Sequence, residues 1–139
     1  MDSYSNLFHR AERYNYFAVY NNIHLVKIEK DYAEGVLEVS QNSYNPLGIV
    51  HGGALATLAD SVAGTAVSTR GRMCVTLNCA INYLAPATGS RIKCVATPQR
   101  VGRTIAVYDV NLTDDQGQKV ASGSFTFYIK DVPIPKYED

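Results

Sequence analysis

The sequence predicts an α+β protein in which one antiparallel sheet curls around a single long helix. Two observations carry this prediction. Residues 52–69 have apolar side chains around nearly the whole helical circumference, which is typical of a helix in the middle of a core. After Arg72 the apolar period changes to two, as in strands with one buried face. With 139 residues and no internal repeat or linker, residues 1–139 are expected to form a single domain.

The first half of the chain predicts three shorter elements. Residues 6–16 favour a helix, with Ser3 or Ser5 as its cap, and the aromatic residues around it are expected to pack on the body of the protein. Residues 23–29 and 33–40 have strand patterns on either side of a turn at Lys30 and Asp31. Turn-forming residues 40–48 then predict a loop that leads to the central helix.

The second half of the chain predicts four strands and a tail. The strands are expected at 75–84, 91–100, 104–114 and 119–130, with connections at 86–89, 101–102 and 115–117. Because connections this short usually join neighbouring strands, they favour an antiparallel meander. Residues 133–139 are expected to form a solvated tail.

Charge and hydropathy exclude several classes of protein. Thirteen basic and thirteen acidic residues give a formal net charge of zero, which argues against a dedicated nucleic-acid binder. The longest apolar stretch, 54–67, is too short and too polar to cross a bilayer, so no membrane partner is expected. Residues 1–10 have no apolar core behind a basic start, so a cytoplasmic protein is expected.

The cysteines and histidines do not form a recognisable metal pattern. Three cysteines without a CxxC pair argue against a disulfide framework and a structural zinc site. Cys79 and Cys94 lie in strand-like runs, where we expect small buried apolar side chains. The histidines lie far apart in the sequence, and no metal or other cofactor is expected; they are His9, His24 and His51.

The segment that carries chemistry is the start of the long helix. Gly52 and Gly53 open it, so free backbone N–H groups there could hold an oxyanion, although a glycine pair before a helix is often only a turn. Asp60 is the one acidic residue of the helix. Partial burial would raise its pKa and its reactivity, whereas a single aspartate in a helix can also simply face water.

Helical geometry separates the two candidate groups. Gly52 and Asp60 lie about 12 Å apart along the helix axis, and Asp60 faces nearly opposite to His51. His51 is expected to be a core histidine that bonds the loop backbone. If both ends of this segment act on one carbonyl, a second subunit related by a two-fold axis has to supply one of them.

At this point the sequence resembles a known family. The pattern N-x-x-G-x-x-H-G-G followed by the helical acid, as Asn45, Gly48, His51, Gly52, Gly53 and Asp60, looks like the hotdog-fold thioesterases of the PaaI type. The resemblance covers roughly 17–129. It continues through stretches 75–77, 81–87, 100–104 and 121–126.

The resemblance implies hydrolysis of acyl-CoA thioesters on a hotdog fold, without a cofactor. In it, the Gly52 N–H polarises the thioester carbonyl, Asn45 assists at the carbonyl or holds water, and His51 fixes the loop. Asp60 of the neighbouring subunit attacks as nucleophile or activates water as base. Thr76 matches a position where the family often has Ser or Thr, which orients the water or the carboxylate.

The resemblance also implies a CoA surface and an assembly. Candidates for contacting CoA are Gly53, Arg100, Gly102 and Arg103, with Arg70 and Arg72 weaker; each arginine could equally be a solvated charge at a strand end. A homodimer, assembled further as a dimer of dimers, is implied. Tyr83 weakly favours aromatic acyl groups. Two alternatives stay open, an enoyl-CoA hydratase or dehydratase of the same fold and a non-catalytic acyl-CoA-binding module.

Overall fold

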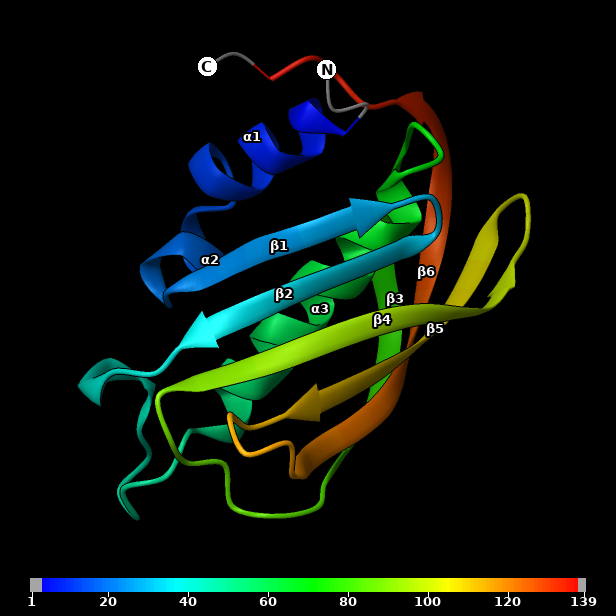
Figure 1. Ribbon diagram of the computed structural model, residues 1–139. Helices are drawn as coiled ribbons and strands as arrows, with labels where there is room; N and C mark the ends of the chain where they lie inside the picture. Colours follow the sequence, from blue (N-terminus) through cyan, green and yellow to red (C-terminus); the bar gives the residue numbers. More distant parts are fainter. Residues whose placement is uncertain (1–3, 138–139) are drawn as a thin grey trace.

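A six-stranded antiparallel sheet curls around one long helix, as the sequence predicts (Figure 1). The computed structural model describes residues 4–137. In chain order its elements are α1 (Ser5–Arg13), α2 (Tyr16–Tyr20), β1 (Ile23–Glu29), β2 (Tyr32–Glu38), a 3-10 turn (Gln41–Ser43), α3 (Gly52–Ser68), β3 (Arg72–Tyr83), β4 (Arg91–Val101), β5 (Ile105–Thr113) and β6 (Lys119–Pro133).

The strand order corrects one prediction. The order is β1-β2-β4-β5-β6-β3, so β4, β5 and β6 form the predicted meander, but β3 pairs with β6 at the far edge of the sheet. The segment after β3 does not turn back as a hairpin. Its Ala87 is buried and accepts a hydrogen bond from Val50 N–H at 2.9 Å, so the chain crosses the loop before α3 and reaches β4 beside β2.

Small residues bring the sheet close to α3. Leu58, Val62 and Ala63 are fully buried against it. A side chain at Gly35 of β2 would place its Cβ 2.5 Å from Val62 Cγ2, so only glycine permits this approach. The opposite face of α3 is not buried, because Thr57, Asp60, Ser61 and Gly64 stay partly or fully exposed. The helix is therefore central to the core but leaves one polar stripe uncovered.

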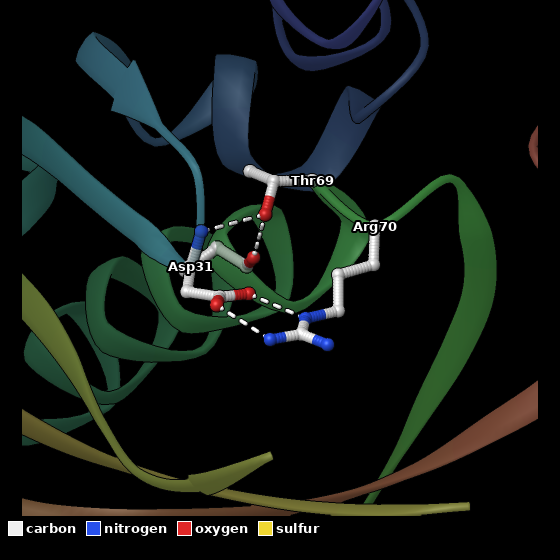
Figure 2. A network of polar contacts seen from close by, with 4 residues as sticks. Asp31, Thr69 and Arg70 are labelled. Carbon is white, nitrogen blue, oxygen red and sulfur yellow. Dashed lines mark hydrogen bonds and ion pairs between the residues drawn. The ribbon is translucent and has the colours of Figure 1, made fainter. Parts of the chain in front are cut away.

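The C-terminal end of α3 is tied to the β1–β2 turn (Figure 2). Asp31 has a left-handed backbone (φ 59°), and its N–H donates to Thr69 Oγ1 at 2.8 Å. The Arg70 guanidinium donates to both Asp31 carboxylate oxygens at 2.8 Å, which lowers the pKa of Asp31 below its ordinary value. This network fixes the hairpin and the helix end to each other.

The N-terminal helix is shorter than predicted. α1 ends at Arg13, and the N–H groups of Tyr14 and Asn15 both donate to the Arg10 carbonyl, which stops the helix before α2 begins. Tyr4 occupies the N-cap position without a side-chain hydrogen bond, so the prediction of Ser5 as the cap is wrong. Ser3 lies outside the described residues.

The predicted solvated tail packs on α1 (Figure 1). Asn6 Nδ2 donates to the Pro135 carbonyl at 3.0 Å, and Tyr137 N–H donates to Asn6 Oδ1 at 2.7 Å. The Tyr137 and Tyr14 rings lie 5.0 Å apart. The prediction of a solvated tail therefore holds for the exposed Pro133, Pro135 and Lys136, whereas the bonds to Asn6 hold the tail against α1.

Candidate active site

One backbone donor remains free at the N-terminal end of α3. His51 is the N-cap residue, and its Nδ1 accepts a hydrogen bond from Gly53 N–H at 2.8 Å. Gly52 N–H donates to no group among residues 4–137. The His51 side chain therefore bonds the backbone of α3 and not that of the loop, and it is exposed, so the prediction of a core histidine bonding the loop is wrong. The end of the helix dipole thus presents the Gly52 N–H to an incoming acceptor.

The loop before α3 is shaped by Asn45. Its Oδ1 accepts from Leu47 N–H at 2.9 Å and from Ile49 N–H at 3.4 Å, and Gly48 adopts a left-handed φ of 77°. The side-chain oxygen of Asn45 therefore serves the turn, which leaves its NH2 group as the donor for a ligand. His51 N–H donates to the Ser43 carbonyl at 2.7 Å and closes the loop onto the helix.

Asp60 and Thr76 are hydrogen-bonded to each other across α3 and β3. Thr76 Oγ1 on β3 donates to Asp60 Oδ1 on α3 at 2.7 Å. This bond fixes the orientation of the carboxylate, while Oδ2 makes no hydrogen bond to residues 4–137. Both side chains are exposed in the single chain, so Asp60 faces solvent there, which is one of the two alternatives that the sequence left open.

The exposure of Asp60 and Thr76 follows from the position of β3 at the edge of the sheet. β3 pairs only with β6, and Val75 and Leu77 are 45% and 53% exposed although both are apolar. Cys79 is also exposed, so the prediction of a buried thiol is wrong there, whereas Cys94 is buried as predicted. No element within residues 4–137 covers this edge of the sheet.

Tyr83 joins β3 to the start of the helix. Its hydroxyl donates to the Gly52 carbonyl at 3.1 Å, and its ring lies where a Cβ on Gly52 would come within 3.2 Å. The aromatic ring therefore stands at the helix end, next to the free Gly52 N–H.

The candidate CoA residues separate into two places. Gly53 lies at the N-terminal end of α3, whereas Arg100 and Arg103 are exposed near the β4–β5 turn, where Gly102 N–H donates to the Ile105 carbonyl at 2.8 Å. Arg72, which follows the C-terminal end of α3, donates to the Arg103 carbonyl. Roughly 25 Å of helix separates these places within one chain, so they do not form one surface there.

A cavity of about 520 Å³ runs along the uncovered face of α3 beneath α1. Asp60, Gly64 and Ser68 recur every fourth residue along its floor, and Arg10 lies at its side. The sequence signal for this cavity was the polar and small stripe in an otherwise apolar helix. Arg10 was missed, because nothing in the sequence places the N-terminal helix over that stripe.

Neither a membrane span nor a metal cluster is found in the described part of the chain. No helix within residues 4–137 is long and apolar enough to cross a bilayer. No three His, Cys, Asp or Glu side chains in the same range lie together as metal ligands.

Solved structures place this architecture in a known fold. It superposes on the PaaI protein of Escherichia coli with a TM-score of 0.89, at 22% identity over 95% of this chain and 96% of that one. A Streptococcus mutans protein whose crystal structure holds acetyl CoA gives a TM-score of 0.77, at 32% identity over 81% and 92%. The architecture is therefore the hotdog fold.

Sequence comparison then gives the family. Residues 47–121, over half of the chain, match the thioesterase superfamily. Acyl-coenzyme A thioesterase 13 of Mus musculus is 34% identical over 67% of this chain and 69% of its own length. Acyl-coenzyme A thioesterase PaaI of Escherichia coli is 27% identical over 71% of each. The chain belongs to the thioesterase superfamily as a PaaI-type, hotdog-fold thioester hydrolase.

Proposed function

We propose that the protein hydrolyses acyl-CoA thioesters in a site shared by two subunits. One observation carries the proposal: a carboxylate held by Thr76 and a free Gly52 N–H lie on one rigid helix, about 12 Å apart. The named activities of the mouse and Escherichia coli relatives and the acetyl CoA in the Streptococcus mutans structure support CoA esters as substrates.

In this mechanism the two subunits act on opposite sides of the thioester. The carbonyl oxygen accepts a hydrogen bond from Gly52 of the partner subunit, with the Asn45 amide of the same loop as a second donor. Asp60 Oδ2 activates a water that attacks the carbonyl carbon, or attacks that carbon itself and is released by water. The C–S bond breaks, the CoA sulfur takes the proton, and the free acid leaves.

The uncovered β3 edge supports a homodimer, and a dimer of dimers is the assembly we expect. β3 is an edge strand whose outer side has no partner strand within residues 4–137, and it exposes the apolar Val75 and Leu77. Such an edge is unusual in a monomer, because exposed edges pair with other chains. A second copy on this edge would bury Asp60 and Thr76 and bring another helix end beside them. Gly53, Arg100, Gly102 and Arg103 from different chains would then contact one CoA.

The first test is Asp60→Asn, assayed by free thiol release from a panel of acyl-CoAs. Loss of the base or nucleophile lowers kcat by about 10²–10⁴, while the binding of an acyl-CoA persists. Thr76→Val is the companion variant, with a smaller loss, because the carboxylate remains but is no longer oriented. Full activity of Asp60→Asn on every ester contradicts the proposal. Hydration of crotonyl-CoA, or tight binding of CoA esters without turnover, would instead identify the hydratase or the binding module.

The shared site has its own test. Asp60→Asn and Gly52→Pro chains are each expected to be inactive as homodimers. Co-refolded at equal amounts, half of the dimers are mixed, and each mixed dimer has one intact site, so about one quarter of wild-type activity returns. If one chain supplied both groups, mixing would restore nothing.

A further inference from the structure

The cavity beneath α1 extends well beyond the reacting groups. Asp60, Gly64 and Ser68 line one face of α3, so its floor runs about 12 Å from the carboxylate to Ser68. Gly64 in the middle of the helix costs about 1 kcal/mol of helix stability relative to alanine. A Cβ there would meet only Phe127 Cε1 at 3.7 Å, an ordinary contact, so packing does not require glycine. The missing side chain instead keeps the cavity open.

A guanidinium lies at the far end of this cavity. Arg10 Nη2 donates to Ser68 Oγ at 2.9 Å, and Ser68 Oγ donates onward to the Gly64 carbonyl at 2.7 Å. Arg10 is half-buried, and no Asp or Glu of residues 4–137 forms an ion pair with it. A partly desolvated charge is costly unless a partner compensates it, and four of its five N–H donors remain for a ligand.

The other groups around Arg10 do not neutralise it. Burial raises the pKa of the Cys74 thiol, so this side chain stays uncharged beside the guanidinium. The other described lining residues near the α1 end and the tail are Ala11, Tyr14, Asn15 and Tyr137, and none of them is an acid of the Asp or Glu type. Asp60, the only carboxylate among residues 4–137 that lines the cavity, stands at the opposite end. The cavity therefore has a negative reacting end and a positive far end.

We infer that the cavity holds the acyl group and that Arg10 binds a carboxylate at the distal end of that group. The preferred substrates are then CoA monothioesters of dicarboxylic acids long enough to span the helix from Asp60 to Ser68. This inference rests on the proposed thioesterase function and names its substrate class. A planar guanidinium pairs with a carboxylate through two parallel hydrogen bonds, which a methyl-terminated chain cannot accept.

The test compares kcat/KM for suberyl-CoA and octanoyl-CoA, which differ only at the distal carbon. The wild-type enzyme is expected to favour suberyl-CoA at least tenfold, and succinyl-CoA, which is too short to reach Arg10, to be poor. Arg10→Gln keeps a donor for Ser68 but removes the charge, and it brings the suberyl-to-octanoyl ratio to about one, mainly through KM. Arg13→Gln, one turn further on an exposed position of the same helix, is the matched control and keeps the wild-type ratio.

Three outcomes overturn the inference. A wild-type ratio near one shows that the distal carboxylate is not recognised. An equal loss on both esters in Arg10→Gln places the guanidinium at the CoA portion that they share. Gly64→Leu fills the cavity without a backbone clash and should suppress both long esters relative to acetyl-CoA; an unchanged ratio puts the acyl group elsewhere. No hydrolysis of any ester by the wild-type protein is a different result, since it rejects the proposed function itself.

Discussion

The two ends of α3 differ in how fully their polar groups are hydrogen-bonded. At the C-terminal end, Thr69 Oγ1 accepts a hydrogen bond from Asp31 N–H and donates one to the Ala66 carbonyl. The Arg70 guanidinium donates to both oxygens of the Asp31 carboxylate. At the N-terminal end, Gly52 N–H has no partner within residues 4–137. A helix end that serves stability satisfies its own groups. An end that leaves a donor free in an exposed loop is prepared for a ligand.

Among changes at the two ends of α3, removing the free Gly52 N–H is expected to have the largest effect. Gly52→Pro deletes the N–H at the first helical position, which proline favours, and His51 already has the extended backbone (φ −61°, ψ 136°) that a following proline requires. Without the oxyanion donor, kcat for acyl-CoA hydrolysis should fall about 10²–10³-fold, with little change in the unfolding midpoint.

Gly52→Ala is the matched control for this variant. Its Cβ meets the same Tyr83 ring at 3.2 Å, but the N–H remains. Activity well above that of Gly52→Pro is therefore expected. Equal losses in the two variants would mean that crowding at Tyr83, rather than the donor, sets the rate.

The opposite end of the helix should respond in stability alone. Arg70→Met removes the bidentate partner of the Asp31 carboxylate. It is expected to lower the free energy of unfolding by only about 1 kcal/mol, because the pair is partly solvent-exposed. Urea unfolding measures this change. Because the Arg70 guanidinium is bound to Asp31 and no longer a candidate for contacting CoA, hydrolysis well below the midpoint should match wild type. Lys30→Met, beside Asp31 in the same turn, is the control and should shift stability by less than about 0.5 kcal/mol.

The smallest effect concerns pH. The Arg70 guanidinium lowers the folded-state pKa of Asp31, so this group stabilises the fold above its unfolded pKa of about 3.9 and loses that contribution as pH falls through the folded value. Asparagine tolerates the left-handed backbone at position 31. The stability difference between wild type and Asp31→Asn should therefore be present at pH 7 and shrink toward pH 2. A stability difference that does not change with pH would show that the charge of the Asp31 carboxylate does not stabilise the fold.

The sequence predicted those parts of the structure that depend on local residue patterns. The apolar circumference of residues 52–69 and the period of two beyond it sufficed for α3 and most strands. The HGG segment, Asp60 and Thr76 led to the candidate reacting groups, whose roles stay predictions. The position of β3 beside β6 was missed because a short connection does not reveal whether it reverses or crosses the sheet. Arg10 was missed for a related reason: its role depends on where α1 packs, which no local spacing encodes.

The 12 Å of rigid helix between Gly52 and Asp60 has a consequence for how the enzyme is regulated by its own abundance. On the proposed mechanism an isolated chain has half of each catalytic centre, so turnover per chain falls toward zero when the protein is diluted below the dissociation constant of the dimer. Output then rises with the square of protein amount when the protein is scarce and becomes linear once pairing is complete.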